Sequence, residues 1–220
     1  MLEVHPPHEA AHSWKDFFIH IATIVVGLLI AVGLEQTVEW FHHRHQMHVA
    51  REHIHDEVLV NQRIVLQNER GTERIIANLE HSLAVVQSLQ GKKPAPAETP
   101  DFSFGLQGFY DAAYTNARDN GTLSLMPYGE AAMYSDAYMG SAFAQQSGLA
   151  LWNQLHEAKA ALHGKSLSQL DADEILPVVS AISEAREKAE LAQETFKVQQ
   201  EEWEAVLSGH FRNDIVGKGK

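Results

Sequence analysis

An uninterrupted apolar run near the N-terminus limits what this chain can fold into. Residues 17–34 read FFIHIATIVVGLLIAVGL, with no formal charge and with His20 as the one ionisable member. A helix rises about 1.5 Å per residue and a bilayer's hydrocarbon core is about 30 Å thick, so a run of this length can just cross it. Trp14 and Trp40 bracket the run, where aromatic rings favour the membrane interfaces. We therefore expect a transmembrane anchor with interfacial flanks over residues 14–41.

Two other uses of such a run are less consistent with the sequence. A cleavable signal peptide would be cut near Ala31-Val32-Gly33, but the stretch ahead of the run is not basic. A buried helix of a soluble protein would need a larger protein around it, because the run has no polar face. Basic residues are nearly balanced across the run and do not set its orientation. Because a short tail ahead of an anchor usually stays inside, we expect residues 1–13 to be a flexible cytoplasmic tail.

Composition excludes several classes of function. Apolar residues make up 45% of the chain, which is enough for a folded core, so we do not expect global disorder. A formal net charge of −12 disfavours binding to a polyphosphate backbone, so we expect no nucleic-acid partner. The lack of cysteine excludes disulfides, zinc–thiolate sites and thiol catalysis.

Hydrophobic spacing beyond the anchor predicts a long helix over residues 42–90. Apolar residues there recur every three or four positions, close to a heptad. Asn61 and Asn68 fall in this seam and fit either register control in a coiled coil or a wetter stretch of a bundle helix. Gly71 marks a candidate kink or break.

Turn and capping signals divide the rest of residues 42–220, the expected extramembrane domain. Residues 91–108 are punctuated by Pro and Gly and predict a loop. The fold class we expect is all-α, with one transmembrane helix continuing into a long amphipathic helix within a bundle of three to four helices. Within residues 109–220, the further helices are expected at about 109–118 with a stop at Asn120-Gly121, at about 127–163 with a stop at Gly164, and from Asp171, at capping-box spacing from Glu174, to Gly209.

Small residues in the anchor suggest a helix-packing face. Thr23, Gly27 and Ala31 are spaced four apart, which places them on one side of the helix and lets a second backbone approach closely. Gly and Ala are also common in spanning helices that have no partner, so both interpretations stay open.

Histidines cluster just beyond the anchor. Neutral imidazole is a common metal ligand, and several of these side chains follow one another at steps of three and four. One straight helix rarely supplies more than two ligands to an ion, so a metal site would need a second helix or a second chain. The alternatives are a pH-sensitive basic collar against anionic headgroups, or a solvated face. The candidate metal ligands are His42, His43, His45, His48, Glu52 and His55.

One histidine lies inside the apolar run itself. His20 is about one turn from the start, four residues after Asp16. Ionisable groups at membrane depth are functional candidates, although His20 is shallow enough to reach the interface with Asp16 as its partner. In the tail, His5, His8 and His12 fit either a metal clip or a solvated segment.

The chain carries no recognisable enzyme motif: no nucleophile elbow, no phosphate loop and no HExxH pair. We therefore expect a non-enzymatic protein, with Glu35, Glu39 and His43 as candidates if the bundle hides a carboxylate–histidine site. Tyrosines and carboxylates also gather between residues 110 and 138, where they could line a ligand pocket or be half-buried packing residues. These are Tyr110, Asp111, Tyr114, Asp119, Tyr128, Glu130, Tyr134, Asp136 and Tyr138.

Two stretches resemble an uncharacterised group of bacterial single-pass membrane proteins. The opening HSWKDFFIHIATIVVGLLIAVGLEQTVEW is similar to the group's HS-x-(K/R)-DF lead, its TI-x-x-G-(L/I)-LIA anchor and the Glu that follows. Residues 113–128, AYTNARDNGTLSLMPY, are similar to its second landmark, although Phe109-Tyr110 stand where a Trp is often found. The resemblance implies a bacterial membrane and an appended helical domain, and it supplies no functional residues.

Together these observations predict a membrane-anchored helical module that associates with itself or serves as an accessory subunit of a membrane complex. We expect it in the inner membrane of a bacterium, with the bulk of the chain on the periplasmic side. Its expected partners are the bilayer and either a second copy or another membrane protein. The alternative is a sensor or binding module whose bundle or juxtamembrane histidines bind a small ligand or a transition metal. No other cofactor is predicted.

Overall fold

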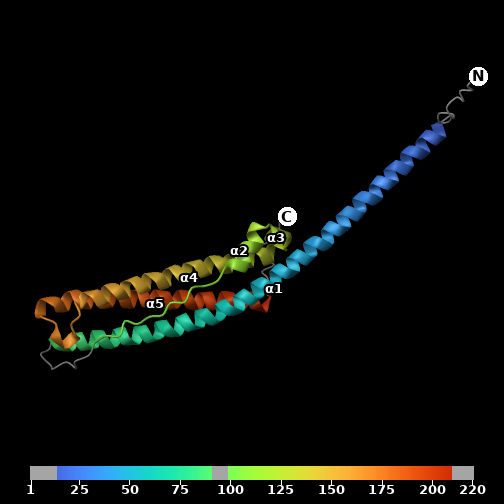
Figure 1. The fold of residues 1–220 in the computed structure, drawn as a ribbon. Coiled ribbons are helices and arrows are strands. Elements are labelled where there is room, and N and C mark those ends of the chain that lie inside the picture. The colour runs from blue at the N-terminus through green and yellow to red at the C-terminus, as the bar shows by residue number, and fades with distance from the viewer. Residues whose placement is uncertain (1–13, 91–98, 210–220) are drawn as a thin grey trace, which may run out of the picture. The chain divides into compact units, whose positions relative to one another are not determined.

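The computed structural model describes residues 14–90 and 99–209, which form helices joined by turns and one extended segment, with no strand among them. The expected all-α fold is therefore confirmed. The predicted tail, with its three histidines, and the first part of the predicted loop lie outside the described residues. The helices are α1 (Trp14–Gln90), α2 (Ala112–Asp119), α3 (Thr122–Leu125), α4 (Tyr128–Ala161), the 3₁₀-helix η1 (Leu167–Gln169) and α5 (Ala172–Ser208) (Figure 1).

The chain divides into two compact units, residues 1–48 and 49–220, and α1 contributes to both. In the first unit, α1 is the only described element. Its apolar run forms an unbroken helix, and no proline interrupts the backbone hydrogen bonds there. Among the described residues, α1 is the one helix long and apolar enough to cross a membrane, judged by length and composition.

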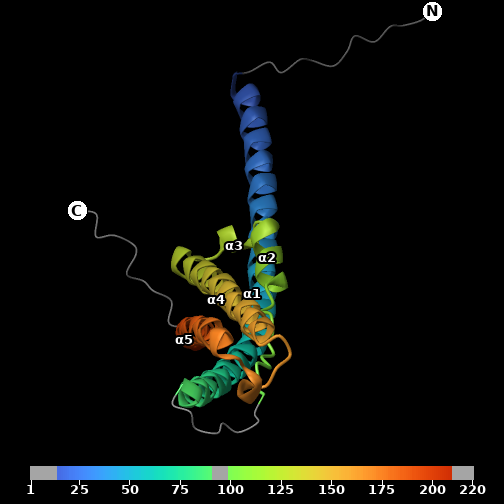
Figure 2. The ribbon, with the colours of Figure 1, turned by 90° about the vertical axis from the view of Figure 1, so that its left-hand side faces the viewer.

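In the second unit, α4 and α5 are the long helices whose backbones come closest together (Figure 2). The distance between packed helices is set by the side chains at their contact, and small side chains allow the shortest distance. Residues on both helices match this rule, because buried alanines recur along each of them. They are Ala137, Ala144 and Ala158 of α4 and Ala185, Ala189 and Ala192 of α5.

The part of α1 in the second unit buries a stripe of larger aliphatic side chains. This stripe follows the predicted spacing of three and four, and it includes Ile54, Val58, Val65, Ile75, Leu79 and Val86. Gly71 does not break the helix, contrary to one of the possibilities drawn from the sequence. A Cβ at Gly71 would lie 3.4 Å from the Phe104 ring, an ordinary van der Waals contact, so Phe104 packs directly over this position.

An extended segment, residues 99–111, runs along the helices of the second unit and is called the strap below (Figure 1). Two buried asparagines of α1 hold its backbone. Asn61 donates to the carbonyl of Tyr110 at 2.7 Å and accepts from its N–H at 2.8 Å. Asn68 does the same with Gln107, at 2.8 and 2.9 Å. Each amide thus pairs with a backbone as a neighbouring strand would, a role that the heptad pattern did not indicate.

The predicted helix ends are reproduced closely. Asp171 caps α5 in a capping box with Glu174, and Gly209 ends it in the left-handed conformation, with φ of 66°. Gly121 and Gly164 also have positive φ, of 80° and 76°, at the predicted stops. The short helices α3 and η1 were not predicted, because four and three residues carry too little periodic signal.

Candidate functional site

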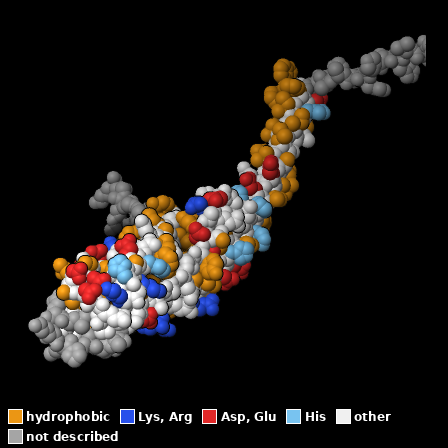
Figure 3. All heavy atoms as spheres, turned by 60° about the vertical axis from the view of Figure 1, so that its left-hand side comes forward, with side chains coloured by type: hydrophobic (Ala, Val, Ile, Leu, Met, Phe, Trp, Pro, Cys, Tyr) orange, Lys and Arg blue, Asp and Glu red, His pale blue; other side chains and the backbone are white. Residues whose placement is uncertain are grey.

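The anchor run presents its apolar side chains on all sides. None of the most apolar 18-residue window of α1 is buried within the chain. The large hydrophobic side chains between Phe17 and Leu34 are each 43–67% exposed, and Figure 3 shows apolar side chains along the visible face of this segment. A continuous apolar surface of this length is unfavourable in water and indicates contact with another apolar surface.

The candidate packing residues Thr23, Gly27 and Ala31 lie in this exposed run. The Thr23 hydroxyl donates to the carbonyl of Ile19 at 2.8 Å, so its hydrogen-bonding capacity is used within the helix. No atom would lie within 4 Å of a Cβ placed at Gly27. The helix surface at Gly27 is therefore open, and no side chain of the described residues covers it.

His20, the histidine within the apolar run, has a local partner. Nδ1 of His20 lies 2.8 Å from the main-chain oxygen of Asp16, one helical turn earlier. The sequence suggested Asp16 as its partner, and the contact observed is with the backbone of that residue. This bond satisfies one ring nitrogen of His20 and leaves the other outside it.

The histidines beyond the anchor have neighbours one turn away on α1. Nε2 of Gln46 lies 3.0 Å from Nε2 of His42, and Nε2 of His43 lies 3.9 Å from Oε1 of Glu39. The candidates His42, His43, His45 and His48 belong to the first unit, whereas Glu52 and His55 belong to the second. Over the described ranges, no group of three or more His, Asp or Glu side chains is close enough together to hold a metal ion. Of the three enzyme candidates, Glu39 and His43 are in contact with each other, and Glu35 is not part of that contact.

A buried ion pair connects α1 and α4 in the second unit. Nε and Nη2 of Arg51 donate to the two carboxylate oxygens of Glu130, at 2.6 and 2.8 Å. Glu130 is buried and Arg51 partly exposed, and the hydrogen bonds that Arg51 donates to Glu130 raise the pKa of Arg51. Burial raises the pKa of Tyr134 to about 12, so its hydroxyl stays protonated and donates to Glu130. With this bidentate geometry the buried carboxylate is neutralised, which indicates a structural role.

A second carboxylate, Glu57 of α1, holds the start of α2. Its oxygens accept the backbone N–H groups of Ala113 and Tyr114, at 2.8 and 3.4 Å, which the first turn of a helix leaves unpaired. Glu57 also accepts the Tyr138 hydroxyl at 2.6 Å, and burial raises the pKa of that tyrosine. Glu57 was not singled out from the sequence, because its partners lie more than fifty positions away.

The predicted tyrosine–carboxylate cluster is brought together only in part. Tyr114 and Tyr138 stack with ring centroids 4.3 Å apart, and with Asp111 and Arg118 they line a hollow of about 470 Å³. Both hydroxyls are engaged, since Tyr114 donates to Ser135 at 3.2 Å. The remaining members are divided between the ion pair and the surface. Glu130 pairs with Arg51 and accepts a hydrogen bond from Tyr134, whereas Tyr110, Asp119, Tyr128 and Asp136 are exposed.

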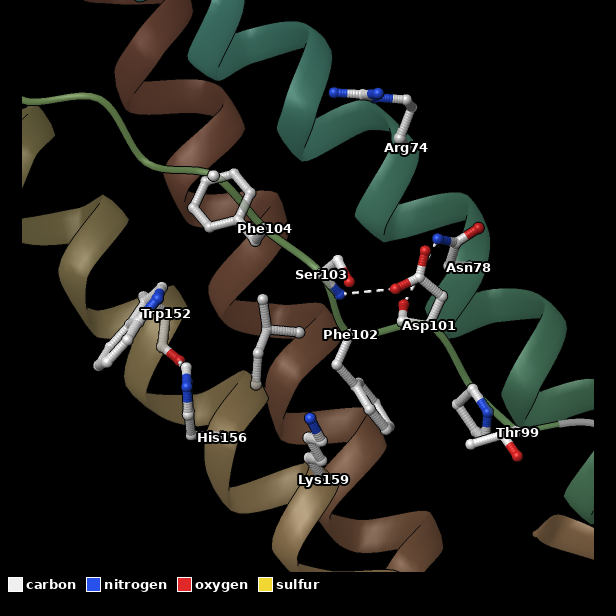
Figure 4. A pocket seen from close by; sticks show the side chains of 13 residues that line it. Arg74, Asn78, Thr99, Asp101, Phe102, Ser103, Phe104, Trp152, His156 and Lys159 are labelled. Atoms are coloured by element: carbon white, nitrogen blue, oxygen red, sulfur yellow. Dashed lines mark hydrogen bonds between the residues drawn. The ribbon is translucent and has the colours of Figure 1, made fainter.

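A larger hollow lies over the strap and is called the strap groove below (Figure 4). It has a volume of about 700 Å³. Arg74 and Asn78 of α1 form one wall, and Trp152, His156 and Lys159 of α4 form the other; strap residues 99–105 lie between them. No residue of this groove was predicted from the sequence. A signal was present, however: in residues 101–107, DFSFGLQ, half-buried and exposed side chains alternate as in a strand.

Comparison with known proteins adds no further assignment. No protein-family model, no curated protein and no solved structure matches this chain.

Proposed function

We propose that this protein is a single-pass membrane protein whose helical unit associates with a second copy or with another membrane protein. One observation supports the proposal above all: nothing in the described chain covers the apolar run of α1. Exposed apolar surface costs about 25 cal/mol per Å² in water, so a run of this size is stable only in a bilayer or against a partner. Trp14 and Trp40 lie about 39 Å apart along the helix, which suits the two interfaces of one bilayer.

The membrane we propose is the cytoplasmic membrane of a bacterium, with the second unit on the periplasmic side. The resemblance of the N-terminal stretch to bacterial single-pass membrane proteins supports the first part. The second part is the orientation expected from the sequence, and labelling of single introduced thiols tests it.

The association face we propose is formed by Thr23, Gly27 and Ala31. Without a hydrophobic driving force between helices in lipid, close backbone packing provides the attraction, and small residues permit it. The open surface at Gly27 and the internally bonded Thr23 hydroxyl support such packing.

The test is the native mass of the full-length chain, gently extracted from its own membranes, with two matched variants. We expect the wild type to migrate as a homo-oligomer or in fixed ratio with one other membrane protein. Gly27→Leu should abolish this, because the larger side chain separates the backbones. Gly33→Leu is the control, since Gly33 is equally open but lies on another side of the helix. A monomeric wild type, or equal behaviour of the two variants, contradicts the proposed association.

The alternative from the sequence was a module that binds a ligand or metal. It is favoured by one feature of the structure, the strap groove, and not by the histidines beyond the anchor.

A further inference from the structure

We propose that the strap groove binds a small organic anion that carries an aromatic ring. This goes beyond the membrane-anchored role and does not depend on it. A volume of about 700 Å³ lies within the range of small-ligand sites, which is about 300–1,000 Å³. Such sites combine an apolar lining with a few polar groups that fix the ligand's orientation, and the groove has both.

The apolar part of the groove is mainly aromatic. Phe102 and Phe104 of the strap are half-buried on its floor, and Trp152 of α4 stands beside them with 42% of its surface exposed (Figure 4). The Trp152 and His156 rings are 3.9 Å apart, and Nδ1 of His156 lies 2.8 Å from the main-chain oxygen of Trp152. Trp152 is thus held in place by its neighbour while its ring still borders open space. A flat ring entering the groove would stack or pack edge-on against these side chains.

The charge of the groove is opposite to that of the whole protein. Lys159 and Arg74 face it from opposite walls, whereas the chain carries a net charge of −12. Neither has an ion-pair partner within the described part of the chain. Figure 4 shows the Lys159 side chain reaching from α4 toward Phe102.

The one carboxylate that lines the groove is already engaged. Asp101 accepts the Ser103 N–H at 2.9 Å, and hydrogen bonds with Ser103 lower its pKa. The groove is therefore lined by two cationic side chains and by one carboxylate that is already hydrogen-bonded. This excess of positive charge favours an anionic ligand.

The strap backbone supplies further hydrogen-bonding groups. Phe102 and Phe104 of the strap, which line the groove, each carry a backbone N–H group. Within the described residues these N–H groups have no hydrogen-bond partner, so they are free to orient a carboxylate.

The probes are 4-fluorophenylacetate and its neutral amide, observed by ¹⁹F NMR with the full-length chain in nanodiscs and with empty nanodiscs as background. We expect the acid to bind about fivefold more tightly than the amide, the upper end of what one exposed ion pair contributes. Lys159→Gln should remove this preference. Lys188→Gln, an exposed lysine of α5 outside the groove, is the matched control and should retain it.

A second variant tests the aromatic part. Trp152→Ala should weaken binding of both probes about tenfold, the size of a lost aromatic stacking contact. Trp152 is well exposed, so this variant should fold, and its thermal melt by circular dichroism verifies that it does. The proposal is overturned if neither probe binds below about 10 mM, if acid and amide bind equally, or if Lys159→Gln behaves as Lys188→Gln does.

Discussion

At the scale of single residues, the most informative side chain is a carboxylate that lacks a partner. Oε2 of Glu202 is buried and has no hydrogen-bond partner among the described residues, and neither has Oε1 of Gln199. A Cβ at Gly140 would overlap the Glu202 carboxylate and would lie 2.6 Å from Oε1 of Gln199. The glycine therefore lets two acceptor oxygens pack against α4. Burial raises the pKa of Glu202, and the charge of Asp136 adds to the effect.

This raised pKa predicts a pH dependence with a definite sign. The native state binds the Glu202 proton more tightly than the unfolded state does. The resulting stabilisation is complete below the ordinary pKa of 4.5 and is lost as the pH rises through the raised value. Glu202→Gln cannot ionise, so at pH 7 it should be more stable than the wild type, by up to about 1 kcal/mol. Below pH 4 the two should converge, because both side chains are then neutral.

Urea unfolding at the two pH values measures this difference. Glu201→Gln is the matched control, because Glu201 is the exposed neighbour on the same helix. A gain at pH 7 that is equal in both variants would show that net charge, and not the environment of Glu202, is responsible.

At the scale of elements, the strap depends on a match between two repeats. Asn61 and Asn68 are seven residues apart on a helix, which is about 10.5 Å at 1.5 Å per residue. Their partners Gln107 and Tyr110 are three residues apart in an extended chain, which is about 10 Å. Seven residues of α1 and three residues of the strap therefore cover nearly the same length, and the strap runs antiparallel to α1.

Removing one of these asparagines should loosen the strap. Asn68→Ala eliminates two hydrogen bonds and leaves both backbone groups of Gln107 without their partner. We expect a loss of about 2 kcal/mol in unfolding free energy and faster hydrogen exchange at the Gln107 amide. Asn153→Ala, at an exposed position of α4, should change neither quantity. Unchanged exchange at Gln107 in Asn68→Ala would contradict the role assigned to the asparagine.

The same element shows what sequence can and cannot reveal. Helix ends were predictable because their signals are local: Asp171 and Glu174 cap each other three residues apart, and Gly121 and Gly209 stop helices at their own positions. The strap's partners are not local, since Asn68 meets Gln107 across 39 positions. Asn61 and Asn68 are seven residues apart, which also fits a heptad seam, so their spacing alone did not indicate the strap. The alternation in residues 101–107 could have indicated an extended segment, but it could not have indicated the helices on which the segment lies.

At the scale of the whole molecule, the two units treat apolar side chains differently. In the first unit the large apolar side chains of the run are exposed, whereas the second unit buries a core that includes Ile54, Leu151 and Trp203. The same helix, α1, takes part in both arrangements because only its side-chain pattern changes, from apolar all round to a single stripe. The proposed periplasmic location of the second unit can be tested directly.

The lack of cysteine makes the orientation measurable, because one introduced thiol is the only thiol. Asn153→Cys places it on an exposed position of the second unit, and Lys15→Cys places it one residue into α1. With a membrane-impermeant maleimide on intact spheroplasts, we expect Asn153→Cys to be labelled and Lys15→Cys to be protected. Detergent should make both reactive, which shows that neither thiol is hidden by folding. Labelling of Lys15→Cys alone would place the helical unit in the cytoplasm, and labelling of both without detergent would mean that α1 does not span the membrane.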